Sequence, residues 1–485
     1  MEYILGIDQS TQGTKAVLVD SHGDMIGRAD FAHQQIINEK GWVSHDLEEI
    51  YTNVLKAARA VVEKTGIDKK EIRAVGISNQ RETTAIWNRD GKPLNQAIVW
   101  QCSRAAEMMK KVQPYGDEIR AVTGIPLSPF FPAAKMAWLL DYTEGIADML
   151  EEDICLGTMD SWLIYRLTGG KEFKTDYSNA SRTQLFDIRN LCWSKKICSY
   201  FGIPQKCLPE VCDSDSLFGM TDFEGFLEQP IPIYGVAGDS HAALFGQGCH
   251  EKGMLKTTYG TGSSIMMNTG EECITSSHGL VTSLAWKLNG RVNYVLEGNI
   301  NYTGAVITWL KDDMKLIESP SETADMARAA NSEDQTVLVP AFSGLSMPYW
   351  KNDARAMLYG MTRTTGRNEV VKAALESIVL QIEAVLNAMR KDSGIEIREV
   401  RTDGGPTRND YLMQLQSDLS DTTVIPAKVE ELSAIGASYM AGMGCGLYSD
   451  KEIFCGTGQN RYLPQMKESV RQEKLRRWEE AVEMV

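Results

Sequence analysis

Hydrophobic positions gather in two short runs at the start of the chain, YILGID and KAVLVD, which the polar turn QSTQGT separates. Two β-rich runs joined by small polar residues predict a β-hairpin. Residues 47–64 then carry apolar side chains at helical spacing, with Asp46 placed to cap this helix and Gly66 to end it. Runs 72–78 and 83–88 are again strand-like and flank the polar segment NQRE. This order predicts an α/β domain with a mixed sheet.

The second half of the chain repeats this order. Residues 254–268, MLKTTYGTGSSIMMN, predict a second hairpin, and its turn YGTGSS is similar in composition to DQSTQGT. A strand, two helices, a further strand and another helix follow. The repeat predicts a duplicated fold with an N-terminal domain over 1–248 and a C-terminal domain over 249–485. Two halves of this size leave a cleft between them, which is a usual place for a ligand.

Composition narrows the classes of function. The 485 residues carry a formal net charge of −15, and an acidic chain without a basic block is a poor candidate for a nucleic-acid binder. No apolar stretch reaches the roughly 18 residues of a membrane span, and no signal peptide precedes the first strand-like run. Ten scattered cysteines and six histidines without metal-ligand spacing favour a reduced, cytoplasmic protein without zinc chemistry.

Three segments rich in Gly, Ser and Thr are candidates for binding phosphate. They are DQSTQGTK at 8–15, YGTGSS at 259–264 and DGGPTRND at 403–410. Small residues in a hairpin turn can aim backbone N–H groups at one point, and a helix N-terminus adds positive potential. Any one of them alone is most simply an ordinary tight turn. Three such segments at matching places in a duplicated fold favour binding of a polyphosphate between the two halves. The sequence has neither a P-loop motif nor a convincing Rossmann motif.

Asp239 stands in VAGDSHAALFGQ, residues 236–247, between small residues and a run that predicts a buried helix. A carboxylate without a partner would be costly to bury beside such a run. From this segment alone, Asp239 is either the N-cap of the helix, which is the commoner use of Asp at such a position, or an acid held there for chemistry.

Several long segments resemble the FGGY carbohydrate kinases, and within that family the members that phosphorylate glycerol. The resemblance runs from residue 3 to about residue 447, and its motifs are at 78–104, 175–188, 296–310, 130–142 and 357–377. It implies an α/β fold of two actin-like (ribonuclease H-like) ATPase domains, duplicated, with an interdomain cleft. It also implies transfer of a γ-phosphoryl group from ATP, with Mg²⁺, to a hydroxyl of a small-molecule polyol or sugar. A homodimer or homotetramer is expected.

The resemblance implies a role for each matching residue. Asp239 matches the catalytic base, which accepts the hydroxyl proton and helps to hold magnesium, and Asp8 matches the acid that binds magnesium through water. The matching positions for phosphate and nucleoside are Thr11, Gln12, Lys15, Thr261, Gly262, Gly304, Thr308, Gly405 and Asn409. Those for the acceptor are Arg81, Glu82, Trp100, Phe130, Asp239, Ser240 and Ser264. Arg81 and Glu82 are expected to hold two vicinal hydroxyls and to satisfy each other when buried.

The sequence departs from the family pattern at several of these positions. The departures are Ser10 for Gly, Lys15 for Arg, Thr308 for Gln, Phe130 for Tyr, Ser240 for Gln and Ser264 for Phe. The missing ring at Ser264 would otherwise close over glycerol. Glycerol, giving glycerol 3-phosphate, is the leading expectation, and a longer polyol or a ketose such as xylulose is the alternative. A nucleotide sensor on the same fold is disfavoured, because a sensor needs no Arg–Glu pair beside a general base.

Overall fold

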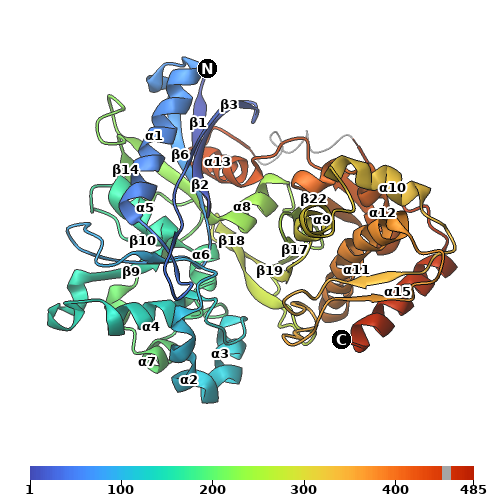
Figure 1. Ribbon diagram of the computed structural model, residues 1–485. Helices are drawn as coiled ribbons and strands as arrows, with labels where there is room; N and C mark the ends of the chain where they lie inside the picture. Colours follow the sequence, from blue (N-terminus) through green and yellow to red (C-terminus); the bar gives the residue numbers. More distant parts are fainter. Residues whose placement is uncertain (450–459) are drawn as a thin grey trace.

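The computed structural model describes residues 1–449 and 460–485 and contains two lobes (Figure 1). The N-terminal lobe is drawn in blue to green, and most of the C-terminal lobe in yellow to red. Helices α8 (Asp239–Gly246) and α13 (Leu432–Gly444) pack against each other between the lobes. The residues that join the two lobes therefore come from both halves of the chain.

The N-terminal lobe is built on a six-stranded sheet in the order β14–β15–β6–β1–β2–β3. These strands are β1 (Tyr3–Gln9), β2 (Gly13–Asp20), β3 (Met25–Ala32), β6 (Ile72–Asn79), β14 (Gly219–Thr221) and β15 (Ile231–Gly238). β1, β2 and β3 pair antiparallel in sequence, whereas β6 runs parallel to both β1 and β15. The first predicted hairpin is confirmed, and every residue of β1 is buried.

The C-terminal lobe repeats this pairing in a six-stranded sheet of order β18–β19–β17–β16–β22–β23. Its strands are β16 (Leu255–Tyr259), β17 (Ser263–Gly270), β18 (Val281–Leu288), β19 (Arg291–Ile300), β22 (Glu399–Asp403) and β23 (Thr423–Pro426). β16, β17 and β19 pair antiparallel, and β22 runs parallel to β16 and β23. The order β19–β17–β16–β22–β23 matches β3–β2–β1–β6–β15, so the predicted duplication is confirmed. The boundary at residue 249 stays a prediction.

A third, five-stranded sheet adds to the N-terminal lobe in the order β4–β5–β8–β7–β9. Its strands are β4 (Ile36–Ile37), β5 (Val43–His45), β7 (Thr84–Asn88), β8 (Ala97–Ile98) and β9 (Ile154–Thr158). The two strand-like runs around NQRE thus enter different sheets, β6 in the first and β7 in this one. The segment between them crosses from one sheet to the other, and it carries Arg81 and Glu82.

The predicted helix at 47–64 is confirmed as α1 (Leu47–Thr65). The Asp46 carboxylate accepts hydrogen bonds from two N–H groups of its first turn, and Gly66 ends it in a left-handed conformation with φ of 68°. The other helices that matter below are α4 (Pro132–Tyr142), α6 (Tyr177–Ser181), α9 (Gly304–Thr308), α11 (Arg367–Ser393), α12 (Asp410–Ser420) and α15 (Glu468–Glu483).

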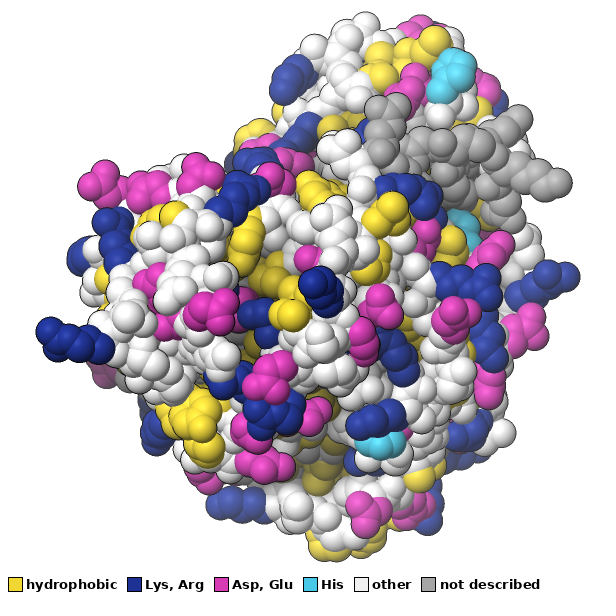
Figure 2. All heavy atoms as spheres, turned by 90° about the vertical axis from the view of Figure 1, so that its right-hand side faces the viewer, with side chains coloured by type: hydrophobic (Ala, Val, Ile, Leu, Met, Phe, Trp, Pro, Cys, Tyr) yellow, Lys and Arg dark blue, Asp and Glu magenta, His cyan; other side chains and the backbone are white. Residues whose placement is uncertain are grey.

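Basic and acidic side chains are interspersed on the face of the C-terminal lobe shown in Figure 2. On α15, for example, Arg476 is paired with both Glu473 and Glu480. The same helix buries Trp478, whose indole N–H donates to the Tyr349 hydroxyl at 2.7 Å. The charges around LRRW therefore form the solvated face of an amphipathic helix. None of the helices in the described ranges is long and apolar enough to cross a membrane.

Helix α13 approaches its neighbours very closely through small residues. A Cβ atom built on Gly436 would lie 1.8 Å from the carbonyl oxygen of Ala242 in α8. On the sheet side, a Cβ on Gly76 of β6 would lie 2.3 Å from the carbonyl oxygen of Ala437. Because both neighbours are backbone, neither contact can be relieved by turning a side chain. The stack of sheet, α13 and α8 depends on these glycines.

We predict that Gly436→Ala lowers the free energy of unfolding by about 1–3 kcal/mol or more, because the added methyl group overpacks a rigid contact. Scanning calorimetry should show this as a clear decrease in the melting temperature. Gly116→Ala is the matched control, because its nearest side-chain atom would lie at an ordinary 3.7 Å. Equal melting temperatures for the two variants would contradict the close packing.

Candidate active site

Three parallel strands end at the same edge of the N-terminal sheet. Asp8 of β1 lies opposite Ser78 of β6, and Gly238 at the end of β15 lies opposite Asn79. The carboxyl ends of neighbouring parallel strands are where open α/β sheets place their ligands. This register brings Asp8 and Asp239 to one edge, although they are far apart in the sequence.

Asp239 is the first residue of α8, and Gly238 occupies the N-cap position. The interpretation of Asp239 as the N-cap is therefore wrong. Its Oδ1 accepts a hydrogen bond from the Ser240 N–H at 2.6 Å, and its backbone carbonyl accepts one from the Ser433 hydroxyl at 3.1 Å. A negative side chain is favourable in the first turn of a helix. The side chain keeps 36% of its surface exposed, so it is accessible to a ligand.

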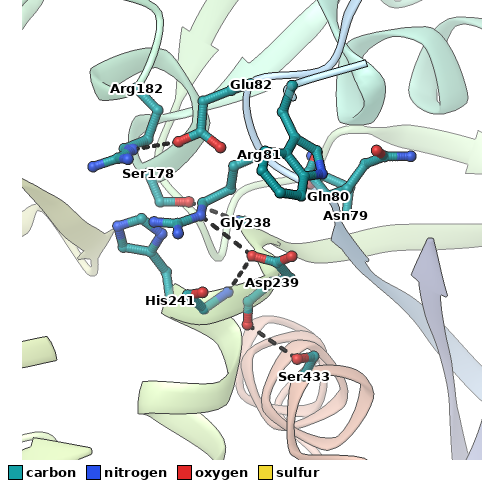
Figure 3. A network of polar contacts seen from close by, with 12 residues as sticks. Asn79, Gln80, Arg81, Glu82, Ser178, Arg182, Gly238, Asp239, His241 and Ser433 are labelled. Atoms are coloured by element: carbon teal, nitrogen blue, oxygen red, sulfur yellow. Dashed lines mark hydrogen bonds and ion pairs between the residues drawn. The ribbon is translucent and has the colours of Figure 1, made fainter. Parts of the chain in front are cut away.

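Arg81 reaches Asp239 (Figure 3) and also a second carboxylate, Glu297 of β19. Its Nε lies 3.2 Å from Oδ1 of Asp239, and its Nη1 and Nη2 donate to the two oxygens of Glu297 at 3.0 and 2.9 Å. Glu82 turns to another arginine, Arg182, whose Nε donates to it at 2.6 Å. The expectation that Arg81 and Glu82 satisfy each other is therefore wrong, although both are buried as expected.

The two arginines share Glu297. Arg182 donates to Glu297 Oε2 at 2.8 Å, so this fully buried carboxylate neutralises two guanidinium groups. Burial alone would raise the pKa of Glu297, but Arg182 and Arg81 hold it well below its usual range. Burial alone would lower the pKa of Arg81, but Glu297, Glu82 and Asp239 raise it. We call Arg81, Glu82, Arg182 and Glu297 the buried charge cluster.

Asp8 is buried beside the cluster and accepts a hydrogen bond from the Ser78 hydroxyl at 2.9 Å. Burial raises its pKa to about 6; Lys15 opposes that shift, and the carboxylate of Asp239 adds to it. Lys15 itself forms an ion pair with Glu431 at 2.8 Å. Two mutually repelling carboxylates with oxygen atoms to spare fit a hard divalent cation.

No group of three or more His, Cys, Asp or Glu side chains across 1–449 and 460–485 could hold a metal ion by itself. Mg²⁺ is commonly held by one or two carboxylates together with waters and substrate phosphates, so the pair Asp8 and Asp239 fits it.

The turn of the second hairpin, a candidate phosphate loop, lies against the start of α9. The carbonyl of Thr261, in the β16–β17 turn, accepts the N–H groups of Thr303 and Ala305 at 2.9 and 3.0 Å. The Gly304 N–H donates to the carbonyl of Gly260 at 2.9 Å. Thus the turn of the second hairpin and the start of α9 form one backbone unit.

Glycine is required in this turn and also in the third candidate loop, which lies against the turn. A Cβ on Gly262 would lie 2.2 Å from the Ile300 carbonyl, and one on Gly404 would lie 2.1 Å from the Tyr259 carbonyl. Gly404 also has a φ of 99°, which L side chains rarely adopt. Gly405 faces open space instead. The close backbone approach of the third loop therefore depends on Gly404 rather than on Gly405, the position that the resemblance assigns to the nucleoside.

Three further positions that the resemblance assigns to the phosphates and the nucleoside have contacts that do not point to a nucleotide. The side-chain Oδ1 of Asn409 caps α12 by accepting the Leu412 N–H at 3.0 Å, and its Nδ2 donates to the Thr323 hydroxyl at 3.0 Å. Thr308 ends α9 with an exposed side chain, and Gln12 is exposed in the first loop. Their roles toward a nucleotide stay predictions.

Two aromatic rings form a wall near the first loop. Trp100 and Phe130 meet edge to face with ring centroids 5.6 Å apart. The Trp100 indole N–H donates to the Thr11 hydroxyl at 2.9 Å, which ties the wall to the β1–β2 turn. Edge-to-face contacts fix ring orientation, so the wall presents a defined apolar surface.

Ser264 lies in the middle of the C-terminal sheet, opposite Thr258 of β16 and Asn299 of β19. Directly paired residues share a face of the sheet, and that face also carries Glu297, two residues before Asn299. Asn299 donates to Glu297 at 3.0 Å. Ser264 therefore points to the side of the buried charge cluster, and its buried hydroxyl oxygen has no hydrogen-bond partner among the described residues.

Comparison with known proteins identifies the fold family. The N-terminal domain of the FGGY family of carbohydrate kinases matches residues 3–246, and its C-terminal domain matches residues 255–445. The chain belongs to the FGGY family of carbohydrate kinases.

The relatives of this FGGY kinase include Glycerol kinase 1 of Thermotoga maritima. It is 44% identical, and the match covers 99% of each chain. The crystal structure of Plasmodium falciparum glycerol kinase with ADP superposes with a TM-score of 0.94 at 35% identity, covering 100% of this chain and 98% of that one. The ligand-bound xylulose kinase of Lactobacillus acidophilus reaches 0.90 at 21% identity, covering 99% and 98%. The last comparison supports the fold alone.

The sequence reading of this FGGY kinase assigned no role to Glu297 or Arg182. Both stand in segments that carry the resemblance: Glu297 in LEGNINY within 296–310, and Arg182 in TDYSNASRT within 175–188. One available signal was a lone carboxylate in the apolar strand run YVLEG, which predicts a buried charge in need of a partner. The identity of the partner follows only from the tertiary structure.

Lys135 of α4 is another buried charged residue, and it lies against the aromatic wall of Trp100 and Phe130. Its ammonium donates to the backbone carbonyl of Phe130, and the side chain is fully buried. Burial lowers its pKa to about 7, and Glu82 opposes that shift. In the unfolded chain the same lysine titrates near 10.4, so between about pH 10 and 7 the unfolded state binds a proton that the folded state lacks.

We predict that Lys135→Met has a higher free energy of unfolding than the wild type. This difference should grow as the pH falls from about 10 to 7. The wild type loses up to about 1.4 kcal/mol per pH unit over this range, and Met removes that loss. Below pH 7 the difference should stay constant. Melting temperatures of both proteins across pH 6–10 test this, and parallel curves would contradict it.

Proposed function

We propose that this FGGY kinase transfers the γ-phosphoryl group of ATP to a hydroxyl of a small polyol, with glycerol as the first candidate. The observation that carries the proposal is Asp239, an accessible carboxylate held at the sheet edge by Arg81 and the first turn of α8. The 44% identity to a glycerol kinase over nearly the whole chain supports the acceptor.

In the proposed reaction Asp239 accepts the proton of the attacking hydroxyl. The hydroxyl oxygen attacks the γ-phosphorus, the bond from phosphorus to the β,γ-bridging oxygen breaks, and ADP leaves with that electron pair. Such a base contributes about 10²–10⁴ to the rate. Arg81 orients the hydroxyl beside Asp239, and Trp100 with Phe130 excludes water from the carbon chain. Phosphoryl transfer depends mainly on such positioning.

Asp8 and Asp239 would hold a magnesium ion, which when bound neutralises charge on the phosphates. The nucleotide would lie on the C-terminal lobe, where Thr261, Gly262 and Gly304 supply backbone and small side chains. Thr11, Gln12 and Lys15 would meet the phosphates from the N-terminal lobe, once Lys15 exchanges Glu431 for phosphate. A homodimer or homotetramer also belongs to this proposal.

We predict that Asp239→Asn lowers the turnover number by about 10²–10⁴ while ATP binding is kept, because the variant cannot accept the proton. The fold should persist: Asn can still accept the Ser240 N–H, and Arg81 keeps both bonds to Glu297. Coupled ADP-release kinetics and calorimetric titration with ATP give the two quantities.

Asp353→Asn is the control, because Asp353 is an exposed carboxylate outside the site. A folded Asp239→Asn protein with near-normal turnover would show that another group is the base.

A longer acceptor is the second candidate, and Ser264 favours it. A small side chain stands on the cluster face where the family pattern has a ring, and its hydroxyl oxygen lacks a partner. A ring removed from a pocket wall removes apolar contact of about 1–3 kcal/mol for a ligand that used it. A four- or five-carbon polyol or a ketose would occupy the volume that the ring takes in the family pattern.

For this second candidate we predict a higher kcat/KM for a four- or five-carbon acceptor than for glycerol, and a shift back toward glycerol in Ser264→Phe. The ring restores apolar contact to a three-carbon ligand. Both constants, measured for glycerol, erythritol, xylitol and xylulose on both proteins, test it.

Ser264→Ala separates the hydroxyl from the space, because it removes the oxygen without adding volume. A tenfold or larger preference of the wild type for glycerol would overturn the longer-acceptor proposal and leave glycerol as the acceptor.

A further inference from the structure

Glu297 uses both of its oxygens in a closed set of contacts. Oε1 accepts from Arg81 Nη2 at 2.9 Å and from Asn299 Nδ2 at 3.0 Å. Oε2 accepts from Arg81 Nη1 at 3.0 Å and from Arg182 Nη1 at 2.8 Å. The residue has no exposed surface. It therefore cannot touch an acceptor or a nucleotide in this arrangement, but it fixes groups that can.

The bidentate pair determines how the Arg81 guanidinium is turned. With Nη1 and Nη2 both held by Glu297, the plane of the guanidinium is fixed and its Nε edge faces Asp239 at 3.2 Å (Figure 3). Two parallel N–H···O bonds add geometric specificity that one ion pair lacks. Glu297 binds the Nη1 and Nη2 edge of the guanidinium and thus fixes the position of Arg81 beside the proposed base, which lies at the Nε edge.

The contacts also cross between lobes. Glu297 belongs to β19 of the C-terminal sheet, whereas Arg81 follows β6 and Arg182 follows α6 in the N-terminal lobe. A movement of β19 relative to β6 would shift the carboxylate and with it the guanidinium. The position of the C-terminal lobe, on which the nucleotide is proposed to bind, therefore determines the position of Arg81 on the proposed acceptor side.

We propose that Glu297 is a positioning residue for phosphoryl transfer, which acts by holding Arg81 against Asp239 and the acceptor. This inference rests on the proposed function. The inference goes beyond the proposed function because it assigns the alignment of the acceptor to a carboxylate of the C-terminal lobe.

The competing explanation is that Glu297 only neutralises two buried arginines. Neutralisation depends on the charge, whereas positioning depends on where the oxygens lie. Glu297→Asp separates the two, because it keeps the charge and withdraws the carboxylate by one methylene. Glu383→Asp is the matched control: Glu383 is a buried glutamate of the C-terminal lobe that is paired with Arg390 at 2.7 Å and lies outside the described site.

We expect Glu297→Asp to lower kcat/KM for the acceptor about 10- to 100-fold, because small displacements of a positioning group are costly. The KM for ATP should stay within about threefold. Glu383→Asp should leave both within threefold. Because Arg81 and Glu297 act as a unit, Arg81→Lys combined with Glu297→Asp should cost little more than Arg81→Lys alone.

Steady-state kinetics with glycerol and the longer acceptors, together with melting temperatures, decide between the explanations. Acceptor and ATP constants within threefold of wild type in folded Glu297→Asp would overturn the inference, as would a proportional loss for both substrates. If Glu297→Asp does not fold, Asn299→Ser serves instead, with an expected acceptor KM at least threefold higher and an unchanged KM for ATP. Absence of any wild-type turnover would contradict the proposed function itself.

Discussion

The structure depends on keeping four charged side chains neutralised away from water. An ion removed from water loses several kcal/mol of solvation, and removing one partner of a buried pair commonly costs about 3–5 kcal/mol. Arg81, Arg182, Glu82 and Glu297 meet this constraint jointly, with no excess charge within the set. Because Glu297 comes from the C-terminal sheet, the arginines are satisfied only when the two lobes meet in one arrangement. The same arrangement places Asp239 at the joint.

Much of the fold could be predicted because its signals are local. A hairpin is specified by two alternating runs and the turn between them, and both predicted hairpins form. Helix α1 begins after Asp46 and ends at Gly66 because a capping carboxylate and a left-handed glycine act within a few residues. The duplication followed from two such local patterns in the same order. The candidate residues near Asp239 came from the resemblance to the family.

The misassigned contacts have a common physical cause. Arg81 and Glu82 are neighbours in sequence, but they lie in a bend between β6 and β7 rather than on a strand. Glu82 moreover has a φ of 61°. Each therefore finds its partner elsewhere: Arg81 binds Glu297, 216 residues away, and Glu82 binds Arg182, 100 residues away. No local pattern encodes such pairings. The position of Asp239 within α8 rather than before it likewise depends on how β15 ends.

The duplicated sheets carry different charged groups at their equivalent edges. At equivalent edges, Asp8 accepts from the Ser78 hydroxyl on the next strand, and Asp403 accepts from the Thr258 hydroxyl. Buried Lys256 donates to Thr258 at 2.8 Å and opposes the rise that burial causes in the pKa of Asp403. Asp8 faces Asp239 as well as Lys15, and Lys15 is itself paired with Glu431. At the N-terminal edge Asp8 thus has a second carboxylate, Asp239, near it, which fits the proposed cation site. At the C-terminal edge Asp403 has the buried Lys256 near it and glycine backbone beside it, which fits the proposed anion site.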